Sequence, residues 1–171
     1  MRQASTEAYL EFAAARSGHL FRSACLLTGG DTHFAEDLVQ ETLGRMYVTW
    51  TRIDRIDNPA GYAQTVLIRT FLTQRRRHSS AEAPTGELPD AGPEFGVSGD
   101  PALRLTLIEA LRQLSPKDRA VVVLRYWEDR SIEATADALH TSSAAVRTRS
   151  TRALAQLRAL LGDSIGELAR P

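Results

Sequence analysis

The sequence predicts an all-α fold made of two small helical domains that a flexible acidic linker joins. Apolar residues recur three and four positions apart along every long segment, which is the period of an amphipathic helix. Residues 79–101 are rich in Pro, Gly, Ser and acidic residues, and they nearly lack large apolar side chains. Such a segment buries too little surface to offset the entropy of ordering it, so it marks the boundary between the domains. We therefore expect the two domains to move independently until they bind a partner.

The first domain, residues 1–78, is predicted to contain three helices. Gly29 and Gly30 end the first helix, because glycine readily adopts the backbone conformation that terminates helices. Asn58 and Pro59 start the third, since Asn caps a helix and Pro suits its first position. The predicted helices cover residues 6–28, 32–51 and 59–77.

The second of these helices carries a polar patch of Asp37, Gln40 and Glu41 on the side opposite its apolar stripe. The three residues stand at i, i+3 and i+4, so they share one face of the helix. A charged patch of this kind is usually only solvated, and docking on a partner is the alternative interpretation.

Charge along the chain is segregated, although Lys+Arg and Asp+Glu are balanced at 21 each and the formal net charge is zero. Residues 59–78 contain Arg69 and the run Arg75–Arg77 without an acidic residue, whereas the linker contains acids without a base. A cationic surface with an aromatic side chain suits single-stranded nucleic acid, and Tyr62 stands in this block. An aromatic residue on an apolar stripe more often belongs to the core, which is the interpretation we favour for Tyr62.

The second domain, residues 102–161, is predicted to contain four helices, followed by a tail over residues 162–171. Ser115 and Pro116, with Asp118 three residues after the cap, form a compact helix start. The run Val121–Val123 resembles a strand, but the caps and the apolar spacing favour a helix that continues to Trp127.

Residues 131–161 have the pattern of a helix-turn-helix. Ser131 caps a short helix, and a longer helix follows a break at His140, where such turns usually place Gly. Histidine enters the required positive φ more readily than most residues. The outer face of the longer helix contains Arg and hydroxyl groups without an acid, which suits phosphates and base edges in a major groove. A solvated amphipathic helix is the plainer alternative. The outer face comprises Ala144, Arg147, Thr148, Thr151, Arg152 and Ala155.

The sequence contains no pattern typical of an enzyme. Its four histidines stand apart from any Cys or acid at metal-ligand spacing, and there is no Gly-rich phosphate loop or nucleophile motif. Cys25 has apolar neighbours and is predicted to be a small core residue. We predict no enzymatic activity, no metal and no cofactor. No apolar run approaches the ~20 residues of a membrane span, and the first residues lack a signal-peptide core, so we expect a cytoplasmic protein without membrane contact.

Four stretches of the chain occur in an order that is far more specific than any one motif. They are AEDLVQETLGRMYVTW, NPAGYAQTVLIRTFL, LSPKDRAVVVLRYWEDRS and AAVRTRSTRAL. Together they resemble the extracytoplasmic-function (ECF) sigma factors of the sigma-70 family, and the SigE-like subgroup most. The resemblance covers Tyr9 to Leu161 except for the linker.

The resemblance implies a sigma factor that binds core RNA polymerase and directs promoter-specific initiation, with region 2 in the first domain and region 4 in the second. Docking on the β′ clamp helices is implied for Asp37, Gln40 and Glu41. Reading of the single-stranded −10 element is implied for Asp54, Arg55, Asn58, Gln64, Arg69, Arg75 and Arg76. Reading of the duplex −35 element is implied for Ser143, Arg147, Thr148, Arg149, Thr151 and Arg152.

Further partners follow from the same resemblance. They are the β flap of the polymerase, promoter DNA and an anti-sigma factor, and the holoenzyme would lie on the nucleoid. The chain departs from the family at Arg69, where Asn is common, and at His140. The runner-up is an autonomous helix-turn-helix regulator whose first domain senses a ligand or dimerises. A third alternative is an interaction module that binds polymerase without reading DNA.

Overall fold

The computed structural model describes residues 2–53, 55–78 and 101–162, and within these ranges all regular structure is helical. The predicted all-α fold of two helical domains is confirmed, whereas the acidic linker lies outside the described residues. The helices are α1 (Arg2–Leu27), α2 (Thr32–Ile53), α3 (Pro59–His78), α4 (Pro101–Gln113), α5 (Pro116–Val122), the π-helical turn η1 (Val123–Trp127), α6 (Ile132–Leu139) and α7 (Ser143–Leu161).

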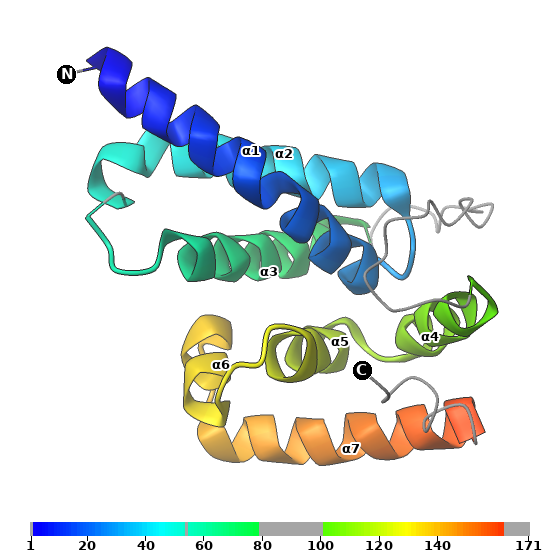
Figure 1. Cartoon of the computed structure of the whole chain (residues 1–171). Coiled ribbons are helices and arrows are strands. Elements are labelled where there is room, and N and C mark those ends of the chain that lie inside the picture. The colour runs from blue at the N-terminus through cyan, green and yellow to red at the C-terminus, as the bar shows by residue number, and fades with distance from the viewer. Residues whose placement is uncertain (1, 54, 79–100, 163–171) are drawn as a thin grey trace.

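Helices α1, α2 and α3 form the first domain, in which α1 crosses over the other two (Figure 1). Its core contains fully buried side chains from all three helices, among them Leu20, Leu38 and Phe71. Asp31 caps α2 by accepting a 3.0 Å hydrogen bond from the Phe34 amide. Helix α1 begins at Arg2 instead of residue 6, since residues 2–5 include neither Gly nor Pro to prevent an earlier start.

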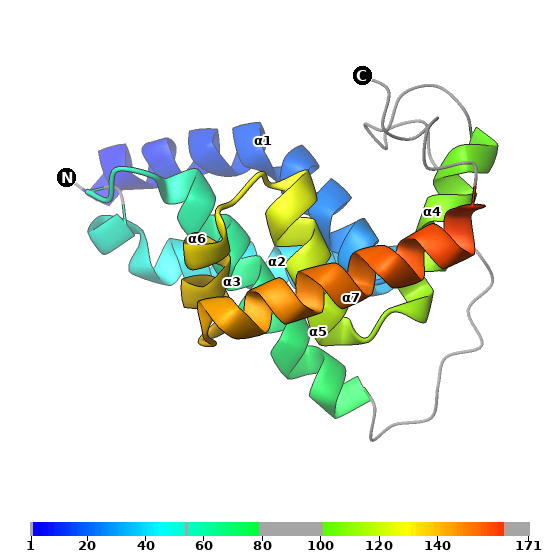
Figure 2. The same cartoon turned by 90° about the horizontal axis from the view of Figure 1, so that it is seen from below.

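Helices α4 to α7 form the second domain, with α7 running across α5 (Figure 2). Helix α5 is the central element, because residues 118–122 are all buried. A helix that is covered on every side needs no polar face, which accounts for the run Val121–Val123. The helical interpretation of this run is confirmed, although its last part takes a π-helical turn in which the Glu128 amide donates to the Val123 carbonyl at 2.9 Å.

The two domains pack against each other, which differs from the independent movement expected from the sequence. The C-terminal half of α1 and one side of α3 lie against α4, α5, η1 and α6, and one hydrophobic cluster spans both domains. Ser23 is fully buried at this junction, where its hydroxyl contacts Glu128 and Trp127 of the second domain. Gly30, with φ of +86°, approaches so closely that an added Cβ would lie 2.9 Å from Cγ2 of Ile108.

Candidate functional site

The turn between α6 and α7 has the geometry that the sequence predicts. Ser131 caps α6 through a 3.0 Å bond from the Ala134 amide, and Ser142 caps α7 through a 3.1 Å bond from the Ala145 amide. His140 has φ of +52° and ψ of +48°, so the left-handed conformation predicted at this position is confirmed. The two caps and the turn fix the direction in which α7 leaves α6.

Helix α7 buries one stripe of side chains and leaves its predicted outer face exposed. Arg147, Thr148 and Thr151 are exposed, and the Arg147 side chain is 60 % accessible. The acid nearest to it is Glu133 of α6, at 4.0 Å. Ser143, in the first turn, is half-buried. The inner stripe is Val146, Ser150, Ala153, Leu157 and Leu161.

Two arginines of α7 turn toward α5 instead of standing free. The Asp118 carboxylate accepts hydrogen bonds from Nη1 of Arg149 at 2.8 Å and from Nη2 of Arg152 at 2.8 Å. Burial raises the pKa of Asp118, but hydrogen bonds from Arg152 and Arg149 and their charges outweigh burial and hold that pKa below its ordinary value. Asp118 therefore stays ionised between the two cations.

The polar patch of α2 is less uniform than its sequence indicates. Asp37 and Gln40 are exposed, as expected for a docking face. Glu41 is half-buried, pairs with Arg45 at 2.6 Å and accepts a hydrogen bond from Gln74 of α3. Glu41 thus already links two helices of the first domain, while its two neighbours are available to a partner.

The residues predicted to read single-stranded DNA fall into three environments. Asp54 lies outside the described residues, and of Arg76 only the backbone, in α3, is described. Arg55 and Asn58 are exposed, and Asn58 caps α3 by accepting a 2.9 Å bond from the Gly61 amide. An added Cβ at Gly61 would lie 2.5 Å from Nδ2 of Asn58, so a larger residue there would displace the capping side chain.

The remaining three of these residues lie farther along α3. Gln64 is only 2 % exposed, and neither of its amide atoms has a partner among the described residues. Arg75 is half-buried. Arg69 donates from Nε to the Ala138 carbonyl at 2.8 Å and from Nη2 to the Asp137 carbonyl at 3.2 Å, so it is occupied by α6. In this arrangement, Gln64 and Arg69 are not presented to a nucleic acid.

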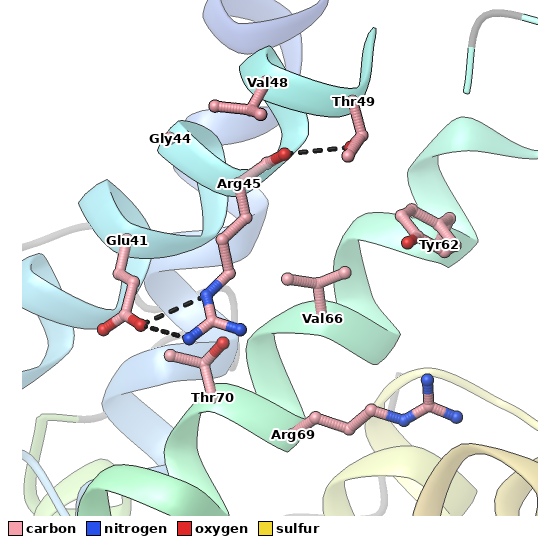
Figure 3. Close-up of a pocket in the computed structure, with 9 residues that line it drawn as sticks. All are labelled: Glu41, Gly44, Arg45, Val48, Thr49, Tyr62, Val66, Arg69 and Thr70. Atoms are coloured by element: carbon pink, nitrogen blue, oxygen red, sulfur yellow. Dashed lines mark hydrogen bonds and ion pairs between the residues drawn. The ribbon is translucent and has the colours of Figure 1, made fainter. Parts of the chain in front are cut away.

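An open groove of about 700 Å³ lies between α2 and α3, with Glu41, Arg45, Tyr62 and Arg69 among its lining residues (Figure 3). Tyr62 is 37 % exposed on this groove, so its assignment to the core was wrong. The apolar stripe predicts burial of Tyr62, but its place in the first turn of α3 leaves it at the rim, where α2 no longer covers it.

The sequence pattern missed the arginines that join the domains. Arg119 is 3 % exposed and donates to the Leu27 carbonyl of α1 at 2.6 Å and to Leu111 and Leu114 at 2.8 and 3.0 Å. Burial, aided by the charges of Arg75 and Arg112, lowers its pKa to about 10. The one signal in the sequence was the apolar run Val121–Val123, which indicates that this part of the chain is covered on several sides.

A second group at the junction is polar and centred on Glu128. Its carboxylate accepts hydrogen bonds from the buried Ser23 hydroxyl at 2.7 Å and pairs with Nε2 of His19 at 2.9 Å. Trp127 stacks on His19 and donates to the Ser23 hydroxyl at 3.1 Å. These side chains come from α1 and from the end of η1, so they connect the two domains.

The described part of the chain has no candidate metal site, no reactive thiol and no membrane-spanning helix. No group of three His, Cys, Asp or Glu side chains there is placed to hold a metal ion. Burial, followed by the charges of Glu36 and Asp31, raises the pKa of Cys25 to about 12, so its thiol stays protonated and unreactive, as expected for a core residue. Among the described helices, none is long and apolar enough to cross a membrane.

Comparisons with known proteins match both domains. Residues 14–81 match the family described as Sigma-70 region 2, and residues 104–157 match Sigma-70, region 4. An RNA polymerase sigma-E factor of Streptomyces coelicolor is 38 % identical over 148 residues, which cover 86 % of this chain and 82 % of that protein. The ECF RNA polymerase sigma factor SigG of Mycobacterium tuberculosis is 32 % identical, over 86 % of this chain and 47 % of its own length.

Solved structures show the same arrangement of helices. The sigma factor RpoE of Bartonella quintana, solved in complex with the anti-sigma factor NepR, superposes with a TM-score of 0.74 at 22 % identity. The match covers 92 % of this chain and 98 % of that one. The extracytoplasmic-function sigma factor SigJ of Mycobacterium tuberculosis superposes with a TM-score of 0.60 at 29 % identity, over 92 % of this chain and 56 % of that one.

Proposed function

The chain belongs to the sigma-70 family of RNA polymerase sigma factors, and on this premise we propose how its two domains divide the work of transcription initiation. Residues 1–78 bind core polymerase and read the −10 element, and residues 102–161 read the −35 element. The alternative of an autonomous regulator is not favoured, since both domains match sigma regions.

Reading of the −35 element is assigned to the outer face of α7, and this exposed face is the observation that carries the proposal. Arg147, Thr148 and Thr151 project from the second helix of a helix-turn-helix, which is the helix that enters a major groove in this motif. Arg147 is free to approach a base edge, because its nearest acid lies at 4.0 Å and is itself exposed. Arg158, exposed near the end of α7, is assigned to the phosphate backbone.

Core polymerase is proposed to dock on the exposed part of the α2 patch, Asp37 and Gln40. Glu41 supports this face through its pair with Arg45 and its hydrogen bond from Gln74. Because exposed side chains contribute little to folding, a face that serves binding can vary without loss of the fold.

Reading of the −10 element is proposed for the surface around Arg55, Asn58 and Arg69, with Arg75 and Arg76 as phosphate contacts. Gly61, Thr65 and Arg69 recur every four residues along α3, and all three contact the second domain. DNA reading through this row therefore requires the second domain to move away from α3.

The proposed partners are core RNA polymerase, through the β′ clamp helices and the β flap, and promoter DNA. An anti-sigma factor is a further proposed partner, since the RpoE neighbour was solved with one. We assign the chain no catalytic role and no cofactor, and place it in the cytoplasm and on the nucleoid when it is part of the holoenzyme.

Transcription from a randomised promoter library by core polymerase with the wild-type chain, Arg147→Ala or Arg158→Ala tests the proposal. Arg147→Ala should relax preference at one base pair of the −35 element, because a bidentate pair gives ~1–3 kcal/mol of discrimination. Arg158→Ala should lower output from all sequences alike and flatten the salt dependence. A wild-type holoenzyme without any upstream preference would contradict the function proposed for α7.

A further inference from the structure

Asp118 is an acid buried beneath the DNA-facing helix. It is the third residue of α5, and its amide donates to the Ser115 cap at 3.2 Å. In a capping box the acid at this position turns back to the cap residue. Here the Asp118 side chain is 5 % exposed, and its carboxylate accepts hydrogen bonds from α7.

The contacts of Asp118 use one specific edge of Arg152. Nε of Arg152 donates to Oδ2 at 3.2 Å, and Nη2 donates to Oδ1 at 2.8 Å and to Oδ2 at 3.0 Å. Arg149 adds a bond from Nη1 to Oδ1 at 2.8 Å. The Nε–Nη2 edge of the Arg152 guanidinium is therefore held by a carboxylate that burial keeps in place.

A guanidinium has five N–H donors in a planar fork and presents more than one edge for paired hydrogen bonds. With the Nε–Nη2 edge occupied, the end edge, formed by Nη1 and the second hydrogen of Nη2, remains. No described residue accepts a hydrogen bond from Nη1, and the Arg152 side chain is 57 % accessible, against 30 % for Arg149. The end edge matches O6 and N7 of guanine in the major groove.

We infer that Asp118 is a positioning residue, which fixes Arg152 so that its free edge reads a guanine in the −35 element. The inference rests on the proposed function of α7. The carboxylate holds the side chain in one rotamer before binding, so less conformational entropy is lost when the base contact forms. Asp118 also offsets one of the two positive charges, which limits attraction to DNA of any sequence.

A purely structural role for Asp118 predicts different behaviour. The carboxylate joins α5 to α7, and removing it would destabilise the second domain whether or not Arg152 meets a base. If the role is purely structural, removing the carboxylate lowers the midpoint of thermal unfolding. The order in which the holoenzyme prefers promoter sequences then stays the same. Base preference therefore distinguishes positioning from simple packing.

The experiment compares Asp118→Asn, Arg152→Ala and the double variant as full-length chains in holoenzyme on a −35 library. Asp118→Asn and Arg152→Ala should lose discrimination at the same G·C pair, by part or all of the roughly 5-fold to 150-fold that one bidentate contact provides. The double variant should lose no more than Arg152→Ala. Binding of Asp118→Asn to unrelated duplex should strengthen at low salt. Glu109→Gln is the matched control, since this exposed acid of α4 pairs with Arg112 and, among the described residues, with no arginine of α7.

A second variant keeps the inference testable if Asp118→Asn folds poorly in a thermal melt. Arg152→Lys retains the positive charge next to Asp118 but lacks the planar second edge, so it should lose the same preference. Unchanged preference in Asp118→Asn, or in Arg152→Lys, would overturn the inference while leaving −35 reading by α7 in place. A wild-type holoenzyme without base preference at any position of the −35 element would instead contradict the function proposed for α7.

Discussion

Nε of Arg69 in α3 donates a 2.8 Å hydrogen bond to the carbonyl oxygen of Ala138 in α6. One side chain therefore links the helix proposed to read single-stranded DNA with the first helix of the duplex-reading motif. Because its Nη2 also donates to the Asp137 carbonyl, two of its three nitrogens are occupied by the second domain.

Arg130→Ala should loosen this closed arrangement. Arg130 donates to the Thr65 hydroxyl at 2.8 Å and to the Gly61 carbonyl, on the row of α3 that also carries Arg69. Without these bonds α6 should leave α3 more often, so the free protein should bind single-stranded −10 DNA more tightly, as measured by fluorescence anisotropy. Arg158→Ala, which removes a cation away from this junction, should not strengthen binding. Equal binding by Arg130→Ala and wild type would show that α6 does not restrict access to α3.

Asp37→Ala combined with Gln40→Ala should weaken binding to core polymerase by about tenfold or more, because charge-assisted hydrogen bonds contribute ~1.5–3 kcal/mol. Both side chains are exposed, so the free energy of unfolding should change by less than about 0.5 kcal/mol. Glu36→Ala, an exposed acid on the same helix, is the control. Glu41 is left intact, since its links to Arg45 and Gln74 would mix folding with binding. Unaltered affinity in the double variant would exclude these two residues from docking.

The contribution of Asp118 to stability should disappear in acid. The pKa of this carboxyl is lower in the folded chain than the ~3.9 of an unfolded Asp, so its contribution is complete above the unfolded pKa. It is lost as the pH falls through the folded pKa. Urea unfolding should show a constant difference between wild type and Asp118→Asn from pH 7 to about pH 5, and a shrinking one below about pH 4. A difference that stays constant below that pH would show that the carboxyl is not paired in the folded chain.

His140→Gly should stabilise the second domain by up to ~1 kcal/mol. A left-handed conformation costs a non-glycine residue ~1–2 kcal/mol, and the greater freedom of Gly in the unfolded chain offsets part of the gain. Chemical denaturation measures the change. Thr141→Gly is the comparison, because Thr141 has no positive φ and should only lose stability. Easier unfolding of His140→Gly than of wild type would mean that the imidazole makes a favourable contribution that outweighs the strain.

Local signals predicted most of the fold. Caps at Asn58, Ser115 and Ser131 placed helix starts correctly, because a cap is a bond between residues two or three apart in sequence. The left-handed turn at His140 was predicted for the same reason. Exposure of α7 followed from its periodicity, since one face of that helix packs and the other does not.

Features that depend on contact between the domains were not predictable in this way. Burial of Ser23 arises where the domains meet, and helical period alone gives no reason for it or for the burial of Gln64 in α3. The composition of the linker predicts independent domains. Composition does not indicate whether the surfaces of the two domains fit together, so their packing was not predicted. Asp118 was assigned to a cap, whereas its carboxylate bonds to side chains more than thirty positions away.

Mutation affects the donor and the acceptor residues of the arginine hydrogen bonds across the domain junction differently. Arg69, Arg112, Arg119 and Arg130 supply the donors, and the main-chain oxygens of Ala138, Asp137, Gly29, Leu27 and Gly61 accept. A main-chain oxygen is present whatever side chain its residue has. Substitution of an accepting residue therefore leaves these hydrogen bonds intact, as long as the backbone conformation does not change. Loss of one arginine removes its bond outright, and lysine, with a single nitrogen, cannot replace the fork. Variation among related sequences should therefore be restricted at Arg112, Arg119 and Arg130 and freer at the exposed acceptor Asp137.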